Sequence, residues 1–306
     1  MNRILVLGAA GMLGHKLCQL LPGCGYKVTG AVRRDAMLLR REAGAIYGGS
    51  ALWDALDVLD PGTLQSAFEA VRPDVVVNCV GLVKQRADAS DRALAVEINA
   101  ALPHRLARLC AAAGARLIHI STDCVFDGTR GGYGEGDPSD ARDVYGKSKY
   151  LGETEEAERA ALTLRTSMIG RELRLPTQGL VEWFLAQRGR TVKGFARAIF
   201  SGFTTIELGR IVDLVVRKGR DLCGTVQVAA RPIDKYALLD LIRREYELDV
   251  TIERDEEFVC DRSLTMDRFA RVTGYEPPQW HEMIRGMYVD PTPYDDVQRR
   301  LAAGLS

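Results

Sequence analysis

The sequence lacks the features that mark several classes of protein. Its 306 residues contain no apolar run of 18, so we expect no membrane span. Lysine plus arginine and aspartate plus glutamate both number 41, and this zero net charge gives no electrostatic basis for binding nucleic acid or an anionic membrane. The first residues pass directly into a strand and a glycine-rich turn, which leaves no room for a signal peptide. We therefore expect a cytoplasmic protein.

Cysteine and histidine patterns are also missing. The seven cysteines form no C-x-x-C pair, and we interpret them as reduced side chains, several of them in the core. The four histidines have neither H-x-x-x-H nor H-E-x-x-H spacing, so we expect no catalytic metal. His119 lies inside an apolar stretch and is interpreted as a core residue. Ser121 has no G-x-S-x-G context, which argues against a hydrolase.

The N-terminal residues predict the start of a dinucleotide-binding βαβ unit. An apolar strand over residues 3–7 is followed at once by G-x-x-G-x-x-G and by a helix expected to end near residue 21. The first glycine suits a tight turn, the second lets a pyrophosphate approach the backbone, and the third lets the helix lie close to the sheet. Phosphates would meet the helix N-terminus. The cofactor-binding residues predicted here are Gly8, Gly11, Met12, Leu13 and Gly14.

The end of the second predicted strand, over residues 26–32, favours NADP, with NAD less favoured. Arg33 and Arg34 follow this strand, and arginines suit a 2′-phosphate where a carboxylate would hold a ribose hydroxyl. The alternative is a solvated basic turn. Further along, Asp57 and Val58 precede a predicted helix, and the aspartate is placed to reach the adenine amino group.

A third predicted strand, over residues 74–79, adds to the same cleft. Its β-branched run is typical of a buried parallel strand. It ends in Cys79, Val80 and Gly81, which we predict to lie against the cofactor, with the glycine allowing close approach to the nicotinamide ribose. The loop that follows contains Lys84, a predicted substrate contact.

The segments around this strand are less decisive. Residues 45–47 are a candidate strand, and residues 61–71 are predicted to form a helix. A long helix is expected over residues 91–113. We interpret Asn99 within it as a structural anchor, because a polar side chain among alanines and leucines usually bonds to backbone or water.

The predicted reactive groups lie between residues 118 and 153. Tyr145 and Lys149 are four residues apart and would share one face of a helix. A nearby ammonium favours the phenolate and would lower the pKa of the tyrosine. Thr122 follows an apolar run that predicts a buried strand, at the strand end where open α/β sheets bind ligands. These three groups suit the polarisation and protonation of a carbonyl, although Y-x-x-x-K alone also occurs in ordinary surface helices.

Beyond residue 166 the regular alternation breaks up. We therefore predict an α/β fold: a Rossmann-type doubly wound parallel sheet over residues 1–166, to which some later segments could return, and a smaller C-terminal α+β substrate-binding cap over residues 167–306. No linker rich in proline, glycine or serine separates the two. The later elements expected are helices over 178–187, 206–218, 234–247, 265–273 and 279–289, a loop over 193–197, and strands over 162–166, 225–229 and 250–253.

Three motifs in this order carry a family resemblance: GAAGMLG, STDCVFDG and YGKSKYLGE. With them the chain resembles the extended short-chain dehydrogenase/reductases, and more narrowly the dTDP-4-dehydrorhamnose reductase group, closely over residues 1–170 and more loosely beyond. The resemblance implies that NADPH delivers a hydride to the 4-keto group of a nucleotide-linked 6-deoxyhexulose, for polysaccharide or cell-surface glycan precursors. It implies Thr122 and Asp123 at the substrate, Tyr145 as proton donor and Lys149 on the nicotinamide ribose.

Four positions depart from the pattern of that group. Cys124 replaces a tyrosine, Cys79 and Val80 replace small alanines, and Met168 stands where a tryptophan is common. All lie near the expected pocket, so the resemblance does not identify which sugar and which nucleotide the substrate contains. The predicted substrate contacts are Lys84, Asp123, Cys124, Phe126 and Arg262, the last as a cation for the diphosphate, with Lys193 or Arg197 as weaker candidates.

Other functions remain open. One is a sugar-nucleotide epimerase or dehydratase of the same fold, although a 4,6-dehydratase should carry two adjacent acidic residues after the threonine and here Asp123 is followed by Cys124. Another is a non-catalytic NADP-binding regulatory subunit, which would have no need to keep all of Thr122, Tyr145 and Lys149. A homodimer is compatible with the sequence.

Overall fold

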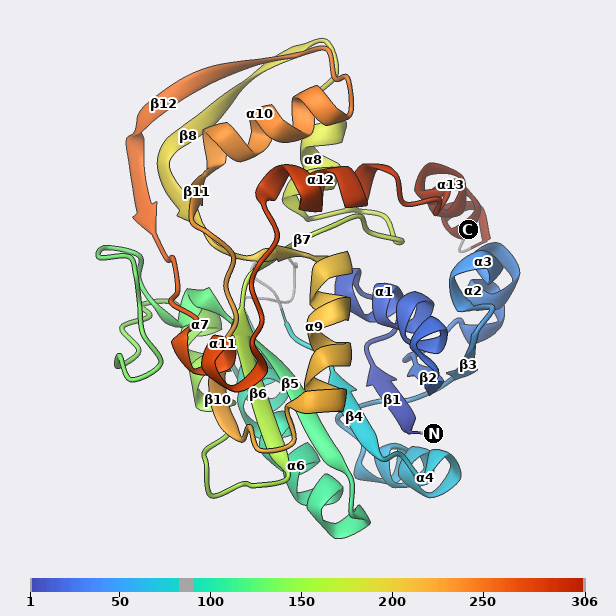
Figure 1. Ribbon diagram of the computed structural model, residues 1–306. Helices are drawn as coiled ribbons and strands as arrows, with labels where there is room; N and C mark the ends of the chain where they lie inside the picture. The colour runs from blue at the N-terminus through green and yellow to red at the C-terminus, as the bar shows by residue number, and fades with distance from the viewer. Residues whose placement is uncertain (1, 83–90, 305–306) are drawn as a thin grey trace.

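A seven-stranded parallel sheet lies at the centre of the computed structural model, which describes residues 2–82 and 91–304 (Figure 1). The strand order reverses between β1 and β4, and in doubly wound folds the carboxyl ends of the strands at such a point open a ligand crevice. The predicted Rossmann-type fold is confirmed. In spatial order the strands are β10 (Gly224–Gln227), β6 (Ala161–Thr166), β5 (Arg116–Thr122), β4 (Val75–Asn78), β1 (Arg3–Leu7), β2 (Lys27–Ala31) and β3 (Ser50–Trp53).

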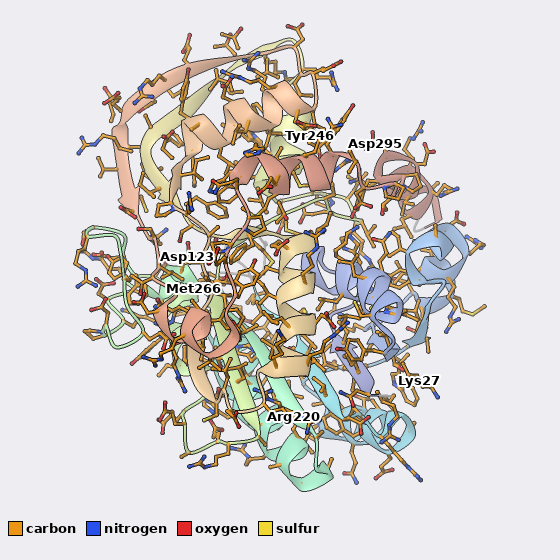
Figure 2. All side chains as sticks on the ribbon, in the orientation of Figure 1. Lys27, Asp123, Arg220, Tyr246, Met266 and Asp295 are labelled. Carbon is orange, nitrogen blue, oxygen red and sulfur yellow. The ribbon has the colours of Figure 1, made fainter. Side chains whose placement is uncertain are left out.

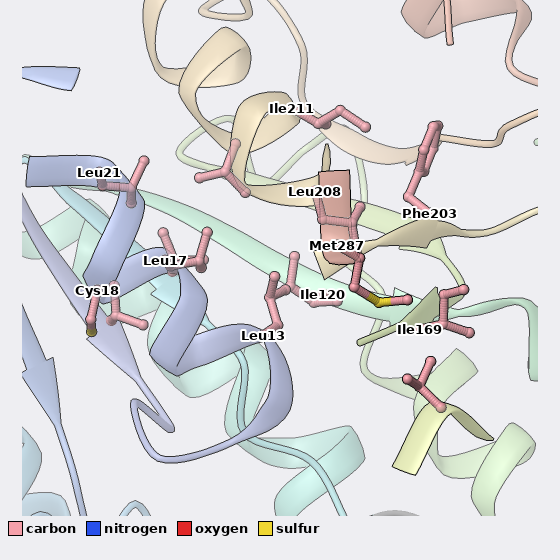
Figure 3. Close-up of a cluster of buried hydrophobic side chains, with 14 of the residues drawn as sticks. Leu13, Leu17, Cys18, Leu21, Ile120, Ile169, Phe203, Leu208, Ile211 and Met287 are labelled. Carbon is pink, nitrogen blue, oxygen red and sulfur yellow. The ribbon is translucent and has the colours of Figure 1, made fainter. Parts of the chain in front are cut away.

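One face of this sheet is covered by α1 (Met12–Leu20) and α9 (Thr205–Lys218), which pack against each other. Figure 3 shows Leu13 and Leu17 of α1 in one buried cluster with Leu208 of α9. Apolar side chains of the sheet complete this cluster, as parallel strands buried on both faces require.

The other face is covered by α4 (Pro61–Val71) and α6 (Leu102–Ala113). The helix predicted over residues 91–113 is present as three successive segments, since α5 (Arg92–Ala95) leads through a π-helical turn at Val96–Ala101 into α6. The helix predicted over 61–71 is also confirmed.

The candidate strand over residues 45–47 is not a strand. The segment forms α3 (Gly44–Tyr47), directly after α2 (Ala36–Glu42), and the strand follows it as β3. Ile46 and Tyr47 are buried in the core, and the Tyr47 hydroxyl donates a hydrogen bond to the Ala9 carbonyl oxygen at 2.8 Å. Adjacent apolar residues here serve a short helical turn, because burial within the fold overrides β propensity.

The loop predicted over residues 193–197 is also wrong, because those residues lie inside β8 (Arg190–Phe200). This strand is the middle of a three-stranded sheet, between β11 (Ile233–Asp234) and β12 (Val250–Asp261). Gly194 indicates a loop in the sequence, but a β-carbon there would lie 2.8 Å from the Tyr236 ring of the helix that covers the strand. The glycine therefore permits close packing.

The remaining elements connect the two sheets or cover them (Figure 1). The short strands β7 and β9 pair with each other, and α13 at the C-terminus, which we did not predict, packs against α2. No helix in the described part of the chain is long and apolar enough to cross a membrane. The remaining helices and strands are α7 (Val144–Leu151), β7 (Met168–Ile169), α8 (Leu180–Leu185), β9 (Phe203–Thr204), α10 (Lys235–Glu245), α11 (Asp267–Thr273), α12 (Trp280–Tyr288) and α13 (Tyr294–Gly304).

Candidate active site

The glycine-rich turn between β1 and α1 forms one wall of the crevice. Gly8 has a φ of 80°, which favours glycine, and a β-carbon on Gly14 would lie 2.1 Å from the Gly8 carbonyl oxygen. Val80, at the end of β4, also contacts this turn, since its Cγ2 would lie 3.2 Å from a β-carbon on Gly8. The turn, the first turn of α1 and the residues after β4 are thus brought together as the sequence predicts.

The N-terminus of α1 fits a dinucleotide pyrophosphate. Gly11 is the N-cap residue and contributes no side-chain hydrogen bond, so backbone N–H groups of the first turn are left to a ligand. Leu13 is buried beneath the turn, whereas Met12 lies at its edge. A β-carbon on Gly179, just before α8, would lie 2.5 Å from the Met12 Cε, so the segment leading into α8 borders the same turn.

Arg33 and Arg34 are exposed at the end of β2, and the structure adds two residues to them. Asp35 has a φ of 72° and its Oδ2 lies 3.8 Å from Arg34 Nε. Arg174, from the segment before α8, lies 3.4 Å from the same oxygen. A carboxylate therefore stands near this strand end after all, between two arginines.

The other predicted cofactor contacts are placed as follows. Asp57 is exposed and Val58 is half-buried against the core beneath α4. Cys79 and Gly81 flank Val80 at the end of β4, and Gly81 lies near the side chain of Asn99. Lys84 lies outside the described residues.

The reactive groups meet where β5 ends and α7 begins. Thr122, the last residue of β5, is buried and its hydroxyl accepts a hydrogen bond from the Cys124 N–H at 3.1 Å. Tyr145 is also hydrogen-bonded to Thr122. Lys149, one turn further along α7, donates to the Ile120 carbonyl oxygen at 2.7 Å. Hydroxyl, phenol and lysine therefore lie within one small region.

The pKa of Tyr145 contradicts one expectation. We expected Lys149 to lower it, but burial raises it above its usual value, helped by the neighbouring Cys124 thiol, and the hydrogen bond with Thr122 only partly opposes this. The tyrosine is thus held as the protonated phenol. Burial lowers the pKa of Lys149 to about 8.

Two glycines fix the position of α7. A β-carbon on Gly146 would lie 2.2 Å from the Cys124 carbonyl oxygen, and one on Gly152 would lie 1.9 Å from the Asn99 carbonyl oxygen. Asn99 itself donates to Ser148 Oγ at 3.1 Å and bonds both backbone groups of Leu82. Its interpretation as a structural anchor is confirmed, since it ties α7 to the π-helical turn.

The predicted substrate contacts other than Lys84 lie close together after the end of β5. Figure 2 shows Asp123 at the carboxyl end of β5. Arg262, after β12, donates from Nε to the Phe126 carbonyl oxygen at 2.7 Å, and its charge partly offsets the increase that burial causes in the pKa of Asp123. A hollow of about 200 Å³ lies here, lined by Cys124, Phe126, Asp127, Thr129, Ala141, Arg142, Asp143 and Arg262.

The weaker candidates are not brought to this site by any contact that the structure gives. Lys193 is 63% exposed and forms an ion pair with Asp255 of β12, and Arg197 lies on β8 in register with Val259. Within residues 2–82 and 91–304 no group of three histidine, cysteine, aspartate or glutamate side chains could hold a metal ion.

Sequence reasoning assigned His119 only to the core, and it assigned no role to Asn78, Glu153 or Arg165, although all four support this site. His119 of β5 contacts both Asn78 and Lys149, and Arg165 of β6 forms a buried ion pair with Glu153. Two features of the sequence could have indicated them: the charged Arg165 in the apolar strand LTLRT and His119 in the apolar strand LIHIST. Neither pattern shows which partner the side chain meets, because those partners lie on other elements.

Comparison with known proteins agrees with this geometry. The family described as RmlD substrate binding domain matches residues 1–174, more than half of the chain. A dTDP-4-dehydrorhamnose reductase from Streptomyces griseus is 38% identical over 152 residues, which are 49% of this chain and 43% of that protein. The methionine adenosyltransferase 2 subunit beta of Danio rerio is 32% identical over 162 residues, 50% of this chain and 43% of that protein. The chain thus matches less than half the length of either relative.

A solved structure extends the likeness of fold to almost the whole chain. The dTDP-4-dehydrorhamnose reductase of Bacillus anthracis, in complex with NADP, superposes with a TM-score of 0.75 at 22% identity and covers 95% of this chain and 100% of its own. At that identity the superposition shows the fold alone. The family match carries the assignment, and it confirms the resemblance seen in the three motifs: the chain belongs to the RmlD substrate-binding domain family.

Proposed function

We propose that this protein is an NADPH-dependent oxidoreductase that reduces the 4-keto group of a nucleotide-activated 6-deoxyhexulose, a step in making polysaccharide or cell-surface glycan precursors. The observation that carries the proposal is the grouping of Thr122, Tyr145 and Lys149 beside a glycine-rich dinucleotide turn. The name of a relative supports it, since the Streptomyces griseus protein is a dTDP-4-dehydrorhamnose reductase.

Each reactive residue has a distinct task in this proposal. Tyr145 gives its proton to the ketone oxygen, and burial suits this task because it keeps the phenol protonated at neutral pH. The Thr122 hydroxyl holds that oxygen as negative charge develops on it. Lys149 orients the nicotinamide ribose. Asp123, Cys124, Phe126 and Arg262 border the sugar nucleotide.

The cofactor fits the chain's own residues. The pyrophosphate would be held by Gly8, Gly11, Met12, Leu13 and Gly14, because Gly14 lets α1 begin close to the turn and the uncapped start of α1 leaves N–H groups for it. When bound, NADPH supplies the hydride. The Bacillus anthracis reductase, solved with NADP, supports this choice. The proposed contacts further along the cofactor are Arg33, Arg34, Asp57, Val58, Cys79, Val80 and Gly81.

Arg33→Ala combined with Arg34→Ala should weaken NADPH binding by about 10²- to 10⁴-fold and NADH binding far less. The reason is that each charge-assisted hydrogen bond to a 2′-phosphate contributes about 1.5–3 kcal/mol, whereas NADH has no such phosphate. Fluorescence titration with both cofactors measures the ratio. Arg40→Ala, an exposed arginine on α2, is the control. Equal weakening of both cofactors would show that this turn does not face the adenosine ribose.

The direct test of function is NADPH oxidation by purified protein with a dTDP-linked 4-keto-6-deoxyhexose. We expect steady turnover, and thermal shifts against dTDP-, UDP- and GDP-sugars should rank the nucleotide, because bound ligand raises apparent stability. Absence of turnover with any keto-sugar nucleotide would refute the proposal.

The cytoplasmic location and a homodimeric state remain predictions.

A second function is favoured by one observation. The beta subunit of methionine adenosyltransferase 2 is among the relatives of this chain, so a role as a subunit of another enzyme is the second candidate. A non-catalytic NADP-binding role would give tight NADPH binding in titrations and no oxidation with any of these sugars.

A further inference from the structure

Both ring nitrogens of His119 face defined neighbours. The side chain is fully buried in β5, in register with Asn78 on β4. His119 Nδ1 lies 3.1 Å from Asn78 Nδ2, and His119 Nε2 lies 3.3 Å from Lys149 Nζ. Asn78 is also fully buried, and only 4% of Lys149 is exposed. Water is therefore not a ready substitute for any of these contacts.

The orientation of the Asn78 amide follows from its second partner. Asn78 Oδ1 accepts a hydrogen bond from the Val80 N–H at 3.1 Å, so the Nδ2 group must face His119 and donate to it. Burial and the charge of Lys149 lower the pKa of His119 well below its usual value, so the imidazole is neutral. Its Nδ1 accepts from Asn78, and its single hydrogen is on Nε2.

We propose that His119 is a positioning residue for Lys149: Asn78 fixes the tautomer of the imidazole, and the Nε2–H then points at Lys149 Nζ and favours its neutral amine over the ammonium. A neutral amine satisfies every contact, because its lone pair accepts from His119 and one N–H donates to the Ile120 carbonyl oxygen at 2.7 Å. One N–H remains for a ligand. An ammonium has no lone pair and would place an N–H against the imidazole N–H.

The other groups around Lys149 do not cancel the preference for the neutral amine that the imidazole N–H creates. Glu153 and Cys79 act in the opposite direction, toward the charged form. Glu153 is already paired with Arg165, and burial raises the pKa of Cys79 to about 12, so that its thiol is uncharged. Among the described residues, His104 also acts on His119, in the same direction and with the smallest effect of the three causes. Burial lowers the pKa of Lys149 to about 8, so the amine is protonated below that pH and neutral above it, and in our proposal the imidazole N–H favours the neutral form as well.

The consequence concerns proton supply, and this step rests on the proposed function. If Tyr145 gives its proton to the ketone oxygen, the phenol must be reprotonated in each cycle. An acid is most effective when its pKa lies near the working pH, and Lys149 comes much closer to that than an ordinary lysine at 10.5. His119 and Asn78 would thus adjust the lysine without touching substrate or cofactor.

The first test needs no substitution and no substrate. In uniformly 15N-labelled protein, long-range 1H–15N spectra distinguish the two imidazole tautomers, and with only four histidines in the chain the signals can be assigned by single replacements. We expect His119 with a hydrogen on Nε2 and none on Nδ1 between pH 6 and 9. A hydrogen on Nδ1 would overturn the inference.

The second test reverses the tautomer. In Asn78→Asp one carboxylate oxygen still accepts from the Val80 N–H, while the other accepts from His119 Nδ1–H, so that Nε2 becomes an acceptor for the Lys149 ammonium. The titration midpoint of Lys149, followed by the 13Cε shift, should rise by about one pH unit. The same change in a His119→Phe background measures the effect of the carboxylate charge alone. An equal rise in both backgrounds would overturn the inference, whereas a clearly smaller rise without the imidazole supports it.

These readouts separate the inference from the proposed function. The tautomer of His119 and the titration of Lys149 are measured without turnover. They therefore test the inference even if no keto-sugar nucleotide is reduced. If the protein does turn over, the decline of kcat with rising pH should move upward in Asn78→Asp by the same amount as the lysine midpoint. If the pKa of Lys149 shifts in Asn78→Asp but the pH dependence of kcat does not, Lys149 supplies no proton.

Discussion

Tyr145→Phe is expected to reduce turnover of a keto-sugar nucleotide by about 10²- to 10⁴-fold while leaving the fold and NADPH affinity intact. The substitution removes only the phenolic hydroxyl, and the loss of a positioned general acid typically has this effect. The hydroxyl is bonded to Thr122 at the end of β5, where the ketone oxygen would be held. The measurement is kcat at saturating NADPH, with cofactor affinity determined separately.

A matched control lies on the same helix. Tyr150→Phe removes the same hydroxyl from a tyrosine that is 43% exposed, and it should leave kcat within about twofold, since surface changes are usually small. If Tyr145→Phe retained activity within a few-fold of the parent, another group would supply the proton. The assignment of residues 118–153 as the reactive centre would then be wrong.

The N-terminal half was predictable because its signals are local. A strand, a G-x-x-G-x-x-G turn and a helix are adjacent in the sequence, and the same is true of Tyr145 and Lys149 on α7. Such short-range patterns depend on the helical repeat and on backbone geometry, which do not vary with the rest of the fold.

Predictions failed where the deciding contact is distant in the sequence. Gly194 favoured a loop, but it lies in β8 because Tyr236 packs against it. The pKa of Tyr145 was expected to fall because of Lys149, whereas burial dominates and raises it, and the hydrogen bond with Thr122 opposes this only in part. Burial depends on the assembled fold, and a charge four residues away along a helix is a weaker influence than desolvation.

The same distinction explains why the side chains behind the site were missed. Arg165 in the strand LTLRT looks like an outward-facing residue, yet it is 3% exposed and in register with Ser121 on β5. Its Nε and Nη2 donate to the two oxygens of Glu153, which follows α7, and Ser121 donates to the same carboxylate at 2.7 Å. The pair therefore joins β5, β6 and the end of α7 directly behind Thr122.

Glu153→Gln should lower the free energy of unfolding by about 3–5 kcal/mol, because it removes the paired carboxylate from the buried guanidinium of Arg165. The side chains of this ion pair are 3% and 5% exposed, and Arg165 Nη1 already has no hydrogen-bond partner among the described residues. Urea unfolding at neutral pH, with an unchanged m-value, measures the loss. Glu256→Gln is the matched control, since the pair of Arg254 and Glu256 is more than half exposed and should contribute less than about 1 kcal/mol.

The double variant Glu153→Met with Arg165→Met tests whether the ion pair of Glu153 and Arg165 positions Thr122. Replacing both charges with apolar side chains removes the desolvation penalty of each, so it should recover most of the stability lost in Glu153→Gln. Ser121 then loses its acceptor at the end of β5, and Thr122 is the next residue. If the double variant is stable but turns over substrate poorly, the ion pair positions the threonine. If both stability and turnover match the parent, the pair positions nothing. A Glu153→Gln variant within about 1 kcal/mol of the parent would contradict the premise that Arg165 depends on this carboxylate.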